Sequence, residues 1–246
     1  MAIVPDLGTL RRLPWQPGTA LVIGDLEQAK DHATIQVSPR QVLRRQIDRL
    51  AERGFVPLVA TELEFIVFDD DYRSAWRRGY RDLTPASDYN IDYSLHASTR
   101  MEPLLRDIRN SMDGAGMYCE GVKGECNFGQ QEIAFRYMEA LETCDNHSIY
   151  KSGSKEIADK HGRSLTFMAK YAMDEVGSSC HIHSSLWDLK GKKSQMWDAK
   201  KPDNMSDTFR WWLGGLVHAS RELALLFAPT VNSYKRFQPD SWAPTA

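Results

Sequence analysis

The sequence predicts an α+β fold built on a largely antiparallel sheet. Strand-like and amphipathic helical segments alternate irregularly along the 246 residues, and several strand segments are placed to pair as hairpins. Neither a GxGxxG nor a GxxxxGK[ST] motif occurs, so the sequence does not support a doubly wound nucleotide-binding sheet or a P-loop. No internal repeat or low-complexity tract interrupts this pattern.

The first expected elements are a strand over 18–27 and a helix that begins at Ser38. Ser38 is a suitable N-cap, Pro39 suits the first helical position and Gln41 completes a capping box. Apolar positions recur along one side of this helix, and Gly54 ends it. The run ATELEFIVF, residues 60–68, then predicts a strand, and residues 69–97 predict an irregular polar excursion.

The rest of the chain is expected to contain three more helices and three strands. Thr99 and Glu102 suggest a capping box for a helix that ends at Gly114, and a turn into a strand is expected over 125–137. A long helix should end near Gly162. The remaining predictions are strands over 164–170 and 179–187 with a loop between them, and a helix from Ser206 to Phe227 with one apolar side.

The composition excludes several classes of protein. Apolar residues make up 42% and charged residues 26%, and the formal charge is −2, so no basic surface favours nucleic acid or an anionic membrane. No apolar run is long enough to span a membrane, and the N-terminal residues lack a signal-peptide layout. The four cysteines, which form no CxxC pair, are expected to be reduced thiols in a cytoplasmic protein.

Three groups of hard ligands lie on or beside predicted strands. Glu62 and Glu64 are two residues apart, as are His181 and His183, so each pair should project from one side of its strand. Glu125 and Glu132 flank the turn CNFGQQ. Taken singly, a glutamate pair is as consistent with a solvated surface as with a metal site. An HxH pair is more often a surface or core feature than a pair of metal ligands.

Together, these residues predict a site for Mg²⁺ or Mn²⁺. Carboxylate oxygens are hard ligands, and the sequence offers no thiolate pair for structural zinc. Cys180 precedes His181 and should point away from the imidazoles, as a structural residue. Two metals held by oxygen ligands could support phosphoryl transfer without a P-loop.

The three groups, in this order, resemble the glutamine synthetase family. The stretches TELEFIVFDD, GECNFGQQEIAFRY, GSSCHIHSSL and PTVNSYKRFQPDSWAPT carry the resemblance, which extends over nearly the whole chain. It implies an ATP-dependent ligase that phosphorylates the γ-carboxylate of glutamate, forms γ-glutamyl phosphate and ADP, and passes the glutamyl group to an amine.

The resemblance also implies roles for individual residues. Glu64, Glu125 and Glu132 would bind the metal nearer glutamate, and Glu62 and His181 the metal that bridges the ATP phosphates. The remaining implied contacts are His183 and Ser185 with the phosphates, Tyr137 with adenine, Gly177 in the loop that holds glutamate, and Arg236 with the glutamate carboxylate. From the residues alone, Tyr137 could equally be a core aromatic, and Ser185 could be an ordinary strand serine. Arg236 could be a surface arginine, although its place in NSYKR beside a Pro-rich loop disfavours that reading.

Departures from the family pattern favour an organic amine over ammonia. Trp242 stands where ammonia-using members carry a glutamate, and it offers an apolar wall for a carbon-bearing amine. The spacing from Glu125 to Glu132 is also one residue shorter than in the best-known bacterial ammonia-using form. Both features resemble the branch that makes γ-glutamyl amides of polyamines or ethanolamine. Val176 replaces the asparagine that usually precedes the glycine of the glutamate loop.

The resemblance implies two domains and a ring-shaped homo-oligomer, a dodecamer, in full-length family members. Residues 1–30 resemble the last strands of an N-terminal β-grasp domain, and residues 31–246 resemble most of a catalytic domain. Family chains are longer, and further metal and phosphate ligands lie beyond the part covered here. We therefore expect this polypeptide alone to be a poor catalyst or inactive.

Three classes of function are compatible with these observations. The first is the glutamate–amine ligase, with ammonia as the alternative acceptor. The second is a non-catalytic relative in which the fold serves as a structural or binding module, and the third is a metal-dependent hydrolase. The absence of an HExxH or Asp-rich motif weakens the hydrolase. Dependence on ATP would separate the ligase from the hydrolase, and turnover would separate it from the binding module.

Overall fold

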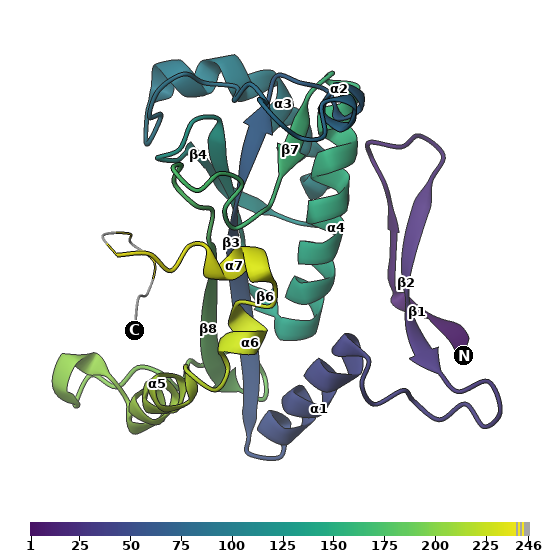
Figure 1. Ribbon diagram of the computed structural model, residues 1–246. Coiled ribbons are helices and arrows are strands. Elements are labelled where there is room, and N and C mark those ends of the chain that lie inside the picture. Colours follow the sequence, from purple (N-terminus) through teal and green to yellow (C-terminus); the bar gives the residue numbers. More distant parts are fainter. Residues whose placement is uncertain (240, 242, 244–246) are drawn as a thin grey trace.

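One long strand, β3 (Phe55–Phe68), organises the sheet in the computed structural model, which describes residues 1–239, 241 and 243 (Figure 1). Every pairing in the six-stranded sheet is antiparallel, which confirms the predicted α+β class. The other strands are β4 (Cys119–Gly124), β5 (Gln130–Phe135), β6 (Met138–Glu139), β7 (Ser164–Thr166) and β8 (Cys180–Asp188). β3 pairs with all of them except β4, which pairs with β5.

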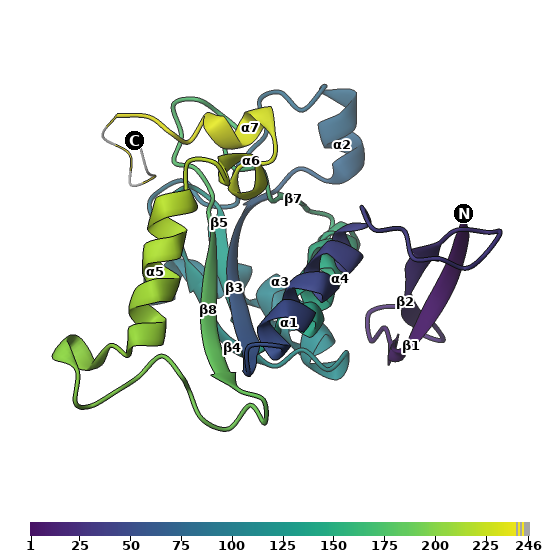
Figure 2. The same cartoon turned by 90° about the horizontal axis from the view of Figure 1, so that it is seen from below.

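Helices cover both faces of this sheet (Figure 2). On one face lie α1 (Pro39–Ala51), α3 (Leu95–Gly114) and α4 (Ala140–Lys160), and α5 (Asp207–Ala219) lies on the opposite side. The main hydrophobic core fills the side of α3 and α4, where Leu63, Phe65 and Val67 of β3 are buried. Because strand residues alternate, Glu62 and Glu64 project from the other face.

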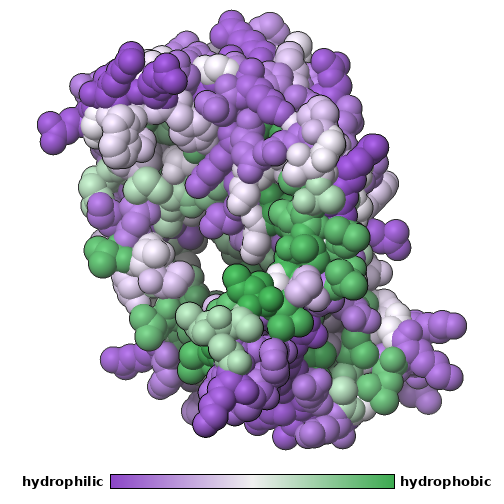
Figure 3. Space-filling model, turned by 90° about the vertical axis from the view of Figure 1, so that its right-hand side faces the viewer, coloured by the Kyte–Doolittle hydropathy of each residue, from purple (hydrophilic) through white to green (hydrophobic). Residues whose placement is uncertain are grey.

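The N-terminal strands form a separate two-stranded hairpin, made of β1 (Ala2–Arg12) and β2 (Ala20–Glu27). The Arg40 guanidinium at the start of α1 donates hydrogen bonds to Asp6, Asp25 and Asp145 and so connects both hairpin strands with α4. The molecular face on the hairpin side carries a band of hydrophobic side chains between hydrophilic ends (Figure 3). The domain boundary near residue 30 stays a prediction.

The excursion over residues 69–97 contains more helix than the sequence indicates. A short helix, α2 (Tyr72–Arg77), begins after Asp71, whose carboxylate accepts a hydrogen bond from the Ser74 amide. The predicted capping box at Thr99 and Glu102 is wrong, because α3 starts earlier and Ser94 caps it by accepting from the Ala97 amide. The earlier start buries Ala97 against the core.

Two other helix predictions need correction. Ser38 precedes α1 as expected, but its side chain makes no capping hydrogen bond. Ser206 does cap α5 by accepting from the Phe209 amide at 3.1 Å. The predicted single helix to Phe227 is interrupted after α5, where the Ser220 hydroxyl bonds locally to the Val217 carbonyl. Three short helical segments also occur, η1 (Pro202–Asn204), α6 (Ala224–Phe227) and α7 (Val231–Tyr234).

Candidate active site

The register of β3 against β5 and β8 brings together the residues predicted to bind metal. Glu62 lies opposite His181 of β8, and Glu64 lies opposite Glu132 of β5. The turn between β4 and β5 places Glu125 beside them, since the Glu125 amide donates to the Gln130 carbonyl. All of these side chains lie on the sheet face away from the main core.

The tight turn before β5 depends on Gly129. Its φ is +67°, and a Cβ atom built there would lie 2.4 Å from the carbonyl oxygen of Val67. Only glycine combines this backbone conformation with so close an approach. The turn therefore fixes Glu125 and Glu132 on either side of one short connection.

Two overlapping groups of ligand atoms result. Glu64, Glu125 and Glu132 form one, and Glu62, Glu132 and His181 form the other; within each group the ligand atoms lie within 4.8 Å of one another. Glu132 belongs to both. The resemblance assigned it only to the metal nearer glutamate, whereas in the structure it lies between the two groups.

The electrostatics of this cluster fit a divalent cation. Burial, together with the neighbouring charges of Glu125, Glu62 and Glu64, raises the pKa of Glu132 to about 7. Burial also raises the pKa of Glu125, although Lys123 opposes this shift. Carboxylates this close together and an imidazole are the donors that Mg²⁺ or Mn²⁺ accepts, and a bound cation would relieve their mutual repulsion.

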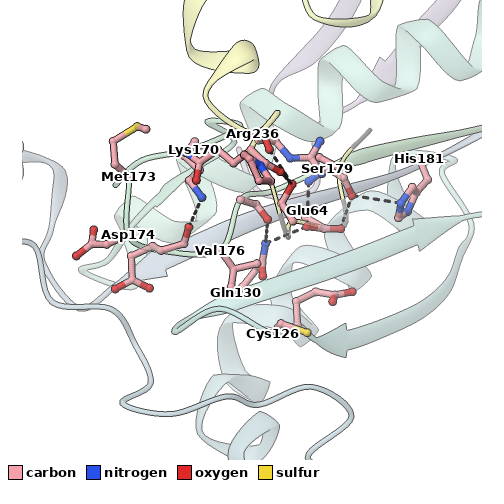
Figure 4. Close-up of a pocket in the computed structure, with 17 residues that line it drawn as sticks. Glu64, Cys126, Gln130, Lys170, Met173, Asp174, Val176, Ser179, His181 and Arg236 are labelled. Carbon is pink, nitrogen blue, oxygen red and sulfur yellow. Dashed lines mark hydrogen bonds between the residues drawn. The ribbon is translucent and has the colours of Figure 1, made fainter. Parts of the chain in front are cut away.

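Glu64 accepts hydrogen bonds from residues that sequence reasoning missed (Figure 4). It is 8% exposed, and it accepts hydrogen bonds from the Gln130 side-chain amide and the Ser179 backbone amide, both at 2.9 Å. The Ser179 hydroxyl donates to its other oxygen. A usable signal existed, because Gln130 and Ser179 each lie two residues before a predicted ligand on the same strand side.

One cavity of about 580 Å³ adjoins Glu64 and Glu125 and contains two of the predicted substrate residues (Figure 4). Gly177 and Arg236 both line it. A Cβ atom at Gly177 would lie 2.8 Å from Cγ of Arg236, so glycine allows the arginine to pack against the loop. Trp242, the predicted amine wall, lies outside the described residues.

A second cavity, of about 310 Å³, adjoins Glu62 and contains the predicted nucleotide contacts Tyr137, His183 and Ser185. Tyr137 is 46% exposed, which is inconsistent with a plain core aromatic. Its ring stacks on Trp187 with 6.2 Å between centroids. Trp187 was missed, although it lies two residues after Ser185 on the same side of β8.

Comparison with known proteins identifies the family. Residues 36–246 match the family model for the glutamine synthetase catalytic domain. The chain belongs to the glutamine synthetase family. A γ-glutamylethanolamide synthetase, GlnA4 of Streptomyces coelicolor, is 56% identical over 245 residues, covering 100% of this chain and 52% of the relative. A glutamate–isopropylamine ligase of a Pseudomonas species is 35% identical over 243 residues, covering 99% and 52%.

The glutamine synthetase fold is also evident in solved structures. A structure of GmaS in complex with ADP superposes with a TM-score of 0.85 at 27% identity, covering 99% of this chain and 54% of that one. The chain thus spans about half the length of the relatives it matches. Within its described part, no helix is both long and apolar enough to cross a membrane.

A third group of possible ligand atoms in this glutamine synthetase-family chain is already paired with a lysine ammonium. Asp92, Glu125 and Cys126 also have ligand atoms within 4.8 Å of one another. The Lys123 ammonium lies 3.0 Å from Asp92 and 2.8 Å from Glu125, and 4.0 Å from the centre of the Tyr93 ring. Lys123 therefore neutralises this edge of the cluster. All four cysteines are free thiols.

Proposed function

We propose that this chain provides metal- and substrate-binding surfaces for an ATP-dependent ligase that joins the γ-carboxylate of glutamate to an organic amine. The observation that carries the proposal is the carboxylate–imidazole cluster between two cavities. One cavity contains Gly177 and Arg236, and the other contains Tyr137 and His183. A phosphoryl group moving from nucleotide to glutamate would cross this cluster.

The residues that would hold two cations are the two overlapping groups described above, with Glu132 shared. When bound, Mg²⁺ or Mn²⁺ supplies positive charge that reduces repulsion between the phosphates and the substrate carboxylate. Arg236 would pair with the glutamate carboxylate. His183, with Nε2 3.1 Å from Glu62, and Ser185 would orient the phosphates, and Tyr137 would contact the adenine.

The proposed reaction has two steps. The γ-carboxylate oxygen of glutamate attacks the γ-phosphorus of ATP, the bond to the bridging oxygen breaks, and ADP leaves. The amine nitrogen then attacks the acyl carbon of γ-glutamyl phosphate, phosphate leaves, and the nitrogen loses a proton. Support for an organic amine comes from the two relatives, one of which is a γ-glutamylethanolamide synthetase and the other a glutamate–isopropylamine ligase.

The test has a binding arm and a turnover arm. In the binding arm, Mn²⁺ titration of the chain should show affinity that falls at least about tenfold in Glu132→Gln. The same change at Glu52, an exposed residue beyond α1, should leave the affinity unaltered. Equal affinities in both variants would refute the assignment of the metal site.

The turnover arm uses this sequence within a chain of its relatives' full length, because the polypeptide alone is expected to be a poor catalyst. ADP release is followed with ATP, Mg²⁺ and glutamate in the presence of ethanolamine, isopropylamine or ammonium. The proposal predicts release that requires both glutamate and an amine, with a higher kcat/KM for an organic amine. A preference for ammonium would overturn the proposed amine class. Tight Mn²⁺ binding without any release of ADP would instead indicate a non-catalytic binding protein.

A further inference from the structure

Two buried amide side chains connect the acidic cluster with the loop over residues 170–178, which we name the substrate loop. Asn127 comes from the turn between β4 and β5, Gln130 is the first residue of β5, and each is 1% exposed. We propose that Gln130, assisted by Asn127, is a positioning residue that fixes Glu64 and the substrate loop in one arrangement and couples cation binding to loop order. This inference rests on the proposed function.

Gln130 makes contacts in three directions (Figure 4). Its Nε2 lies 2.9 Å from Oε2 of Glu64, 3.1 Å from the Gly177 carbonyl and 3.1 Å from the Ser178 hydroxyl. Its Oε1 accepts a hydrogen bond from the Asn127 backbone amide at 2.9 Å. A single amide group thus contacts a predicted metal ligand, the substrate loop and the turn that carries Glu125.

Asn127 fixes the same loop one residue earlier. Its Nδ2 donates to the Val176 carbonyl at 2.6 Å, and its Oδ1 accepts from the Phe128 amide at 2.7 Å. Although its carbonyl is hydrogen-bonded to Asn127, Val176 is 51% exposed and lines the cavity. The two amides together therefore hold three consecutive loop residues, 176–178.

Coupling follows from the number of donors. A primary amide has two hydrogens, whereas Nε2 of Gln130 faces three acceptors. Any change in how strongly Glu64 attracts the amide therefore alters the strength of its hydrogen bonds to Gly177 and Ser178. A cation that binds Glu64 competes for the same oxygens, so cation binding and loop order share one hydrogen-bond network.

Gln130→Met tests the proposal, because methionine keeps the side-chain length and removes all of these hydrogen bonds. Gln131→Met is the matched control. Gln131 is the adjacent strand residue, is 0% exposed, and has no hydrogen-bond partner for either side-chain polar atom within the described part of the chain. Both variants lose a buried amide, but only the first loses contacts to Glu64 and the loop.

Two readouts are measured, the affinity for Mn²⁺ alone and hydrogen exchange of the amides over residues 176–179 with and without Mn²⁺. In the wild type and Gln131→Met, Mn²⁺ should change exchange in this segment. In Gln130→Met, exchange should be faster without metal, should no longer respond to Mn²⁺, and the affinity should fall about 10- to 100-fold. An affinity equal to that of Gln131→Met, or an unchanged response of the loop, would overturn the proposal.

Asn127→Ala keeps the proposal testable if Gln130→Met fails to fold. It removes the contact with Val176 and leaves Glu64 and its partners in place. We expect faster exchange at 176–178 with an affinity for Mn²⁺ close to the wild-type value, and unchanged exchange would count against the inference. If the wild type binds no Mn²⁺, the proposed function and the coupling both fail, whereas loop ordering by Gln130 is still decided by exchange without metal.

Discussion

Replacing Arg40 by methionine should lower the free energy of unfolding by about 3–5 kcal/mol. The Arg40 side chain is 12% exposed and lies 2.8 Å from each of Asp6, Asp25 and Asp145. These carboxylates belong to β1, β2 and α4, so one guanidinium holds the N-terminal hairpin against the rest of the molecule. Methionine retains most of the apolar stem and removes the charge.

The magnitude follows from which carboxylates would be left without a cation. Arg44 also contacts Asp6 and Asp25, at 3.0 and 3.1 Å, and would still compensate them in part. The Asp145 side chain is 9% exposed, and within the described residues its only ion pair is with Arg40. A buried charge that loses its partner retains the full cost of desolvation, which accounts for most of the expected loss.

Urea denaturation of the wild type and the Arg40→Met variant measures this difference, with Arg49→Met as the control on the exposed side of α1. The control should change stability by less than about 0.5 kcal/mol. The hydrogen bond from Arg40 lowers the pKa of Asp6. The contribution of this carboxylate to the free energy of unfolding is therefore fully present above its unfolded pKa of 3.8, and it is lost as the pH falls through its folded pKa. The difference between wild type and variant should therefore shrink below that pH. A loss under about 1 kcal/mol at neutral pH, or one independent of pH, would refute this reasoning.

Three further predictions test other parts of the structure. Gly177→Ala should lower the free energy of unfolding by about 1–3 kcal/mol, because its Cβ would lie 2.7 Å from the Ala169 carbonyl oxygen. In α5, the Cβ of Gly214→Ala meets no atom within 4 Å, so this substitution should raise the free energy of unfolding by about 0.5–1 kcal/mol. Urea denaturation that gives the opposite order contradicts this. Burial lowers the pKa of His147, so the wild type should lose stability as the pH falls below 6.5, and thermal melts should show a smaller loss for His147→Gln. Mn²⁺ should raise the melting temperature of the wild type more than that of Glu132→Gln, and equal shifts would exclude Glu132 as a ligand.

The strand period and one glycine turn account for the part of the site that sequence reasoning located. Two-residue spacing placed Glu62 with Glu64, and His181 with His183, on common faces, and the structure has them there. The turn at Gly129 brought Glu125 and Glu132 to the same place. These relations are local, so they can be seen in a single sequence. Their roles as metal ligands stay predictions.

What the sequence could not provide are contacts between distant segments. Gln130 meets Gly177 across 47 positions. Two-residue spacing places Gln130 on the same side of the strand as Glu132, but nothing in the local sequence shows that Gly177 lies there. The start of α3 was missed for a related reason. Ser94 and Thr99 are both acceptable caps, and burial of Ala97 against the core favours the earlier one.

The alternation along β3 makes fold and site inseparable. Leu63 and Phe65 enter the core, while Glu62 and Glu64, which alternate with them, face the cluster. A shift of one residue would place carboxylates in the core and apolar rings in the cavity, so core packing strongly opposes it. Apolar contacts on the opposite face of the same strand thus offset the repulsion among the carboxylates and keep them together. Substitutions that loosen that core should therefore also disturb the cluster, even where they touch none of its residues.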